Sequence, residues 1–130
     1  MRNVHSIALF GEAERGSFEQ GLICNQVADL LDCFGHPPPE SLGLHYAVQA
    51  LLYQYPIIFF RVEQEGFSKK DYFNGIKILS TSPLIESVHA ICTPGVGDHT
   101  IIDALISLCY EHHQILIFNE RDFLDYLSYA

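Results

Sequence analysis

The stretch Ile57-Ile58-Phe59-Phe60-Arg61-Val62 decides the fold, because five of its six side chains are apolar. A strand with one face in water alternates apolar and polar side chains, whereas a strand covered on both faces shows no such alternation. Uninterrupted apolar strands are typical of parallel sheets, in which helical crossovers cover both faces. The stretch therefore predicts a fully buried strand of an α/β protein.

Three more apolar runs of strand length lie elsewhere in the chain. They cover residues 4–10, 88–92 and 115–118. Apolar side chains at helical spacing predict helices after three of the four strands, over residues 68–79, 101–110 and 120–127. The helix over 101–110 is apolar almost all round, so we expect it to be well buried.

A first helix is predicted over residues 17–34. Ser17 and Gln20 have the spacing of a capping box, which satisfies backbone N–H groups where a helix begins. Gly35 suits the end of this helix, because glycine readily adopts the backbone conformation found there. The apolar side chains fall on one helical stripe: Ile23, Val27, Leu30, Leu31 and Phe34.

Residues 41–54 leave two alternatives open. Residues 46–53 indicate a short buried helix, whereas residues 42–47 are compatible with an edge strand. Pro56 ends the element in either case, because the residue before a proline avoids the helical conformation.

Strands alternate with helices along the whole chain. This order favours a three-layer, doubly wound sheet of four or five mostly parallel strands, of the flavodoxin-like or Rossmann-like kind. No linker divides the chain, so we expect residues 1–130 to form one domain.

The composition limits the classes of partner and compartment. Sixteen acidic against seven basic side chains give a net charge of −9, which disfavours nucleic acid and anionic membrane as partners. The first residues do not resemble a secretory signal, and we expect a cytoplasmic protein. The seven histidines show no metal-ligand spacing, so neither a metal nor a cofactor is expected. Four cysteines without a C-x-x-C pair indicate buried free thiols: Cys24, Cys33, Cys92 and Cys109.

A ligand site is expected at the carboxyl ends of the strands, where doubly wound sheets bind their ligands. The polar and glycine residues after the strands make the candidate binding site: Gly11, Arg15, Thr93, Gly95, Gly97, His99, Thr100 and Asn119. Gly95 and Gly97 leave the backbone bare, so that a ligand can approach closely. The loop that holds them has no lysine and is not a Walker-type loop. We expect a nucleotide, nucleoside or sugar phosphate at this edge.

Candidate catalytic residues are the carboxylates Glu12, Asp98 and Asp103. Within residues 92–118, the run Asp98-His99-Thr100-Ile101-Ile102-Asp103, the apolar helix and the strand after it resemble the nucleoside 2-deoxyribosyltransferase-like and related nucleotide-binding α/β families. The resemblance implies that Asp103 is a nucleophile on a sugar, and that N-glycosidic bonds are the substrate class. The alternative role for Asp103 is the far end of a capping box begun by Thr100.

Two further classes of function stay open, and the sequence does not decide whether the protein is an enzyme. One is a receiver-like interaction module, in which Glu12 and Glu14 follow the first strand. Phosphotransfer is not expected of it, because Asn119 stands where a receiver carries a lysine after its last strand. The other is an acidic adaptor or chaperone that works as a homodimer.

Overall fold

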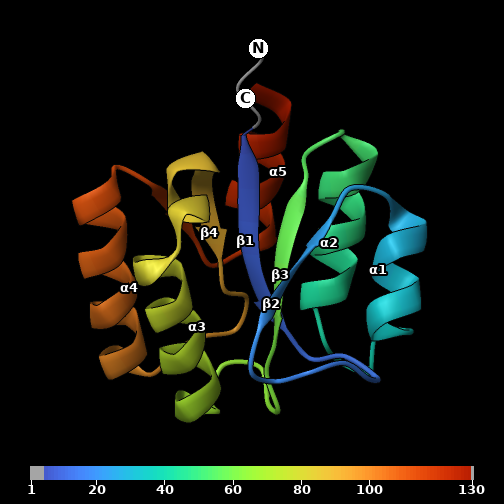
Figure 1. The fold of residues 1–130 in the computed structure, drawn as a ribbon, viewed down its shortest axis with the longest axis horizontal. Helices are drawn as coiled ribbons and strands as arrows, with labels where there is room; N and C mark the ends of the chain where they lie inside the picture. The colour runs from blue at the N-terminus through green and yellow to red at the C-terminus, as the bar shows by residue number, and fades with distance from the viewer. Residues whose placement is uncertain (1–4, 130) are drawn as a thin grey trace.

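A five-stranded sheet lies between two layers of helices in the computed structural model, which describes residues 5–129 (Figure 1). The strand order is β2-β3-β1-β4-β5, and only β2 runs antiparallel to its neighbour. The expected three-layer, doubly wound α/β fold with a mostly parallel sheet is confirmed. The strands are β1 (Ser6–Gly11), β2 (Gly21–Cys24), β3 (Ile57–Arg61), β4 (Val88–Cys92) and β5 (Ile115–Ile117).

Each face of the sheet has its own hydrophobic core. Helices α1, α2 and α5 pack on one face, and α3, α4 and the short 3₁₀-helix η1 pack on the other, where α3 and α4 lie side by side (Figure 1). No helix in residues 5–129 has the length and apolar character needed to cross a membrane. The helices are α1 (Val27–Phe34), α2 (Gly43–Leu52), α3 (Lys69–Thr81), η1 (Pro83–Ser87), α4 (His99–His112) and α5 (Glu120–Tyr129).

Strand β3 contributes to both cores, as its sequence predicts. Ile57 and Phe59 belong to the core under α1, α2 and α5, whereas Ile58 and Phe60 belong to the core under α3 and α4. None of these four side chains is more than 4% exposed. The absence of alternation in the sequence therefore reports burial on both faces.

The predicted helix over residues 17–34 is wrong in its first half. Residues 21–24 form strand β2, which pairs with β3, and α1 begins only at Val27. The Ser17 hydroxyl accepts a hydrogen bond from Glu19 N at 3.0 Å, within a loop. Gly21 explains the difference, because glycine disfavours a helix interior and here leaves room for the Phe60 ring, which a Cβ would approach to 2.6 Å.

Two other predictions are corrected or decided by the packing. The segment after the proline run is the helix α2, so the edge-strand alternative for residues 42–47 is wrong. Helix α4 is longer than predicted and is not buried all round, since Ile106 is 51% exposed and Tyr110 85%. Helix α4 is therefore an outer layer of the sheet with one buried face. Of the four cysteines, all are free thiols, but Cys33 is exposed.

A histidine pair lies at the amino-terminal end of the sheet, where His5 directly precedes β1 and His89 belongs to β4. The Nδ1 atoms of His5 and His89 lie 2.8 Å apart, so one ring donates and the other accepts. Burial, and then charge on His5, lowers the pKa of His89 from its usual 6.5. The folded state therefore disfavours the protonated form of His89. The contribution of this pair to the stability of the fold is complete above pH 6.5 and is lost as the pH falls below that value.

We therefore expect the urea midpoint of the wild-type protein to be lower at pH 5.5 than at pH 7.5. The decrease should be smaller in His89→Gln. The glutamine keeps a polar side chain but does not titrate in this range. Ionisation of other groups is common to both proteins, so the difference between them isolates the histidine pair. Parallel pH profiles for the two proteins would contradict the prediction.

Candidate functional site

Loops that follow β1, β3 and β4 meet at the carboxyl edge of the sheet, as expected for neighbouring parallel strands. The loop after β3 reaches both of the others. Its Glu65 contacts Glu12 after β1, and its Gly66 lies against Gly95 after β4, whose carbonyl oxygen would be 2.3 Å from an added Cβ. The β3–α3 loop therefore lies across the crevice between β1 and β4, where doubly wound folds commonly bind ligands.

Glu12 and Glu65 form a reciprocal clasp at this edge. Glu65 Oε2 accepts hydrogen bonds from Glu12 N and Gly43 N, both at 2.9 Å, and Glu65 Oε1 accepts one from Leu42 N at 2.9 Å. In return, Glu12 Oε2 accepts from Glu65 N at 2.9 Å. The amino-terminal end of α2, which favours an anion, is thus occupied by a carboxylate of the protein itself.

Gly11 is required by packing between β1 and α2. A Cβ on Gly11 would lie 2.6 Å from Gly43 Cα, and a Cβ on Gly43 would lie 2.5 Å from Gly11 Cα. Backbone therefore packs directly on backbone at this crossing. The close approach that glycine allows at Gly11 is made by α2.

Asp98 is the N-cap of α4. Its carboxylate accepts from Thr100 N at 2.9 Å, from Ile101 N at 3.2 Å and from the Thr100 hydroxyl, and Lys69 Nζ lies 3.4 Å away. The Thr100 hydroxyl is the main cause that lowers the pKa of Asp98 to about 2, so the group is ionised at neutral pH. The alternative capping box begun by Thr100 is wrong, because Asp98 caps this helix.

His99 and Asp103 lie on the first turns of α4, and both are exposed. Within the described part of the chain, no hydrogen bond joins Glu12, Asp98 and Asp103 to one another. Glu12 is held by the clasp and Asp98 by the start of α4, whereas Asp103 has no such partner among residues 5–128. Their catalytic role stays a prediction.

The loop after β4 combines open backbone with a buried hydroxyl. A Cβ on Gly95 or Gly97 would meet nothing within 4 Å, and only Gly95, at φ 81°, requires glycine for its conformation. Thr93 is fully buried, and its Oγ1 has no hydrogen-bond partner among the described residues. Burial raises the pKa of the neighbouring Cys92 thiol, which disfavours a reactive thiolate there.

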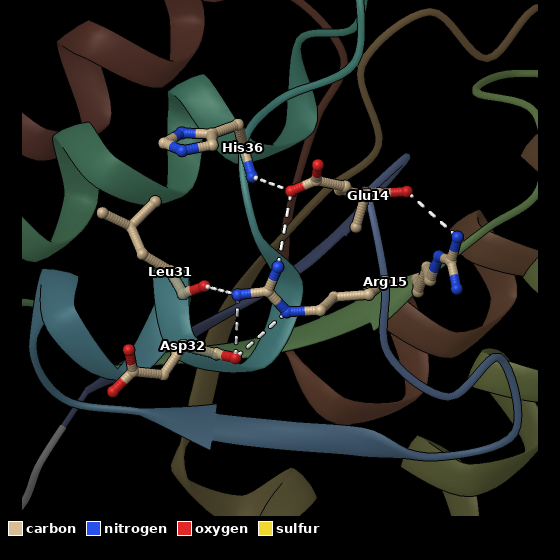
Figure 2. A network of polar contacts seen from close by, with 7 residues as sticks. Glu14, Arg15, Leu31, Asp32 and His36 are labelled. Carbon is tan, nitrogen blue, oxygen red and sulfur yellow. Dashed lines mark hydrogen bonds and ion pairs between the residues drawn. The ribbon is translucent and has the colours of Figure 1, made fainter.

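Arg15 and Asn119 stabilise helix ends. Figure 2 shows the Arg15 guanidinium directed at the last turn of α1, where it donates to Leu31 O at 3.0 Å and Asp32 O at 3.3 Å. Asn119 Oδ1 accepts from Asp122 N at 2.9 Å at the start of α5. Each of these two predicted ligand residues therefore has a structural role.

A groove that the sequence analysis did not identify lies beside α3, with a volume of about 720 Å³. One wall comes from the loop between β1 and β2, and the other from the outer face of α3. We name it the α3 groove. Its lining residues are Phe18, Glu19, Glu63, Lys70, Asp71, Phe73, Asn74 and Lys77.

Arg61, the last residue of β3, positions the loop wall of the α3 groove. Its guanidinium donates to Gly16 O at 2.7 Å and to Ala13 O at 3.1 Å. The same guanidinium lies 4.1 Å from the centre of the Phe18 ring, in cation–π contact. One face of Phe18 is thus held by Arg61, and the side chain stays 38% exposed at the groove.

The sequence did contain a signal for the helical wall. One face of a helix is indicated by the spacing of Phe73, Asn74 and Lys77, which lie three, four and seven residues after Lys70. The polarity of Lys70, Asn74 and Lys77 indicated only a face turned to water. The opposite wall comes from residues some fifty positions earlier, in the segment mispredicted as helix, so the groove was not visible from the sequence.

Comparisons with known protein families, with curated proteins and with solved structures gave no match. The resemblance to deoxyribosyltransferase-like families therefore stays a prediction. Within the described residues, no group of three or more His, Cys, Asp or Glu side chains is arranged to hold a metal ion. What defines the protein is an open, mixed α/β sheet with a polar and aromatic groove between the β1–β2 loop and α3.

Proposed function

We propose that the protein binds a small ligand in the α3 groove, from the group of nucleotides, nucleosides and sugar phosphates. The observation that carries the proposal is the lining, which combines two lysines that have no ion-pair partner among residues 5–129 with two half-exposed aromatic rings. The groove begins just after β3, where Glu63 lines it, and continues along α3 as far as Lys77. Its volume of about 720 Å³ falls within the range of small-molecule sites.

The distribution of basic side chains supports this choice. The chain has only seven Lys and Arg side chains, and four of them fall within residues 61–77: Arg61, Lys69, Lys70 and Lys77. Arg61 is bound to the β1–β2 loop and Lys69 to Asp98. Lys70 and Lys77 make no ion pair or hydrogen bond within the described residues, although the protein has a net charge of −9. Two such ammonium groups on one face of α3 can bind the phosphate of a ligand, although three carboxylates also line the groove.

The aromatic side chains support a ligand with apolar surface. Phe18 is 38% exposed and Phe73 39%, and both line the groove. Exposed aromatic rings at a concave surface supply stacking area for a ligand. The carboxylates of Glu12 and Asp98 accept hydrogen bonds from the backbone N–H groups of Glu65 and Thr100, and neither carboxylate lines the groove.

Binding is tested by thermal-shift measurements and calorimetry with members of the three ligand classes. We expect at least one class to bind the wild-type protein, and the double variant Lys70→Gln/Lys77→Gln to bind it at least tenfold more weakly. At a hundredfold excess over the dissociation constant, the ligand should stabilise the fold by about 2.7 kcal/mol.

The matched control is Lys69→Gln, which removes a neighbouring lysine that pairs with Asp98 and does not line the groove. This variant should bind the ligand as the wild type does. Failure of all three classes to bind at millimolar concentration would refute the proposal, as would a double variant with wild-type affinity.

A further inference from the structure

We infer that the ligand of the α3 groove is a nucleoside phosphate, bound with its base on Phe18, its phosphate at Lys70 and Lys77, and its sugar hydroxyls at the groove carboxylates. The inference rests on the proposed function and narrows it to one of its ligand classes. Three features of the lining carry it, one for each part of such a ligand.

The first feature is the Phe18 ring, which is fixed in place before any ligand arrives. The Arg61 guanidinium lies 4.1 Å from the ring centre, and its own position is set by hydrogen bonds to two loop carbonyls. A ring held on one face and exposed at the groove offers an ordered surface for stacking. A nucleobase would extend the stack of guanidinium and ring, whereas a sugar phosphate has no flat face to place there.

The second feature is the spacing of the lysines. Lys70 and Lys77 lie two turns apart on α3, a rise of about 10.5 Å, with Asn74 between them. Their flexible four-carbon stems allow the two ammonium groups to approach a phosphate from opposite sides. A nucleoside without phosphate would leave both charges unused.

The third feature is the set of carboxylates in the groove. Glu19, Glu63 and Asp71 also line it, and Asp71 Oδ2 accepts a hydrogen bond from Glu63 N at 2.8 Å. Three carboxylates oppose the binding of a bare phosphate ion, but they accept hydrogen bonds from sugar hydroxyls. The mixed lining therefore favours a ligand that carries hydroxyl groups between its ring and its anion.

Calorimetric titration with four probes tests the inference: adenosine 5′-monophosphate, adenosine, ribose 5-phosphate and inorganic phosphate. We expect the nucleotide to bind at least tenfold tighter than each of the other three. If ribose 5-phosphate binds as tightly as the nucleotide, the inference is overturned while the proposed function stands. If none of the probes binds, both are overturned.

The variant Phe18→Leu separates stacking from charge. It keeps an apolar side chain but removes the flat ring, so the preference for the nucleotide over ribose 5-phosphate should fall about tenfold. Affinity for ribose 5-phosphate itself should not change. The matched control Phe67→Leu alters an exposed phenylalanine outside the groove and should keep the full preference. A Phe18→Leu protein that folds and retains the wild-type preference would overturn the inference.

Discussion

Replacement of Glu65 by alanine is expected to destabilise the folded state by about 3 kcal/mol, because it leaves three backbone N–H groups without an acceptor. Glu12 N, Leu42 N and Gly43 N all donate to this one carboxylate at 2.9 Å. A buried donor that loses its partner costs about 1–3 kcal/mol. Since the site is only partly buried, water can replace part of the loss, which keeps the expected total near the lower end of the sum.

The free energy of unfolding in urea at pH 7 measures this effect. Glu63→Ala is the matched control, because it removes an exposed carboxylate from the same loop, and it should change stability by less than about 0.5 kcal/mol. The stability loss in Glu65→Gln should lie between those of the other two variants. Its amide keeps one acceptor oxygen, but its NH₂ group faces backbone N–H groups that are also donors. A Glu65→Ala protein within 1 kcal/mol of the wild type would show that the clasp does not hold the loop.

Gly43→Ala is expected to destabilise the fold by at least about 3 kcal/mol. The new Cβ would stand 2.5 Å from Gly11 Cα, which is closer than van der Waals contact allows. Overpacking against side chains commonly costs about 1–3 kcal/mol, and here the obstacle is backbone that cannot rotate away. Helix α2 must move off β1, which also lengthens the hydrogen bonds from Leu42 N and Gly43 N to Glu65. The small gain in helix propensity from alanine does not offset this loss.

Gly97→Ala provides the control for this second prediction. Its Cβ would meet nothing within 4 Å, and the backbone there is not in the left-handed region. The substitution should therefore leave the thermal midpoint unchanged or raise it slightly, because alanine restricts the unfolded chain. Equal losses for Gly43→Ala and Gly97→Ala would contradict the packing described for β1 and α2.

Much of the fold was predictable because its three central strands, β1, β3 and β4, are buried on both faces. Apolar runs around Ile58, Ile91 and Leu116 identified β3, β4 and β5, and their alternation with helices indicated a parallel sheet. Burial depends on side-chain type at each position, so a local pattern reports it well. The shared carboxyl edge of the strands followed from the same pattern.

The region between β1 and α1 was not predictable in the same way. Strand β2 has four residues, a length at which an apolar run does not distinguish strand from helix. Its pairing with β3 joins residues more than thirty positions apart, such as Gly21 and Phe60. Because long-range contact overrides local helix preference, the capping-box spacing at Ser17 misled the prediction.

The residues of the candidate site show the same division. Asp98 and Asn119 were predicted as site residues, and in the structure both cap helices. Glu65 was not among the predicted site residues, because its three donors lie 22, 23 and 53 residues away in the chain. The α3 groove was not predicted for the same reason, since Phe18 and Lys70 line it from segments that are some fifty positions apart in the chain.

From its amino-acid order alone, the chain determined which segments are buried on both faces, and hence the class of fold and the edge at which its loops gather. Tertiary structure alone decided which loop residues meet there: Glu65 with the start of α2, and Phe18 with the outer face of α3. The physical reason is the separation along the chain of the residues that interact. Burial and periodicity are properties of neighbouring residues, whereas a clasp or a groove depends on the spatial approach of segments that are distant in the chain.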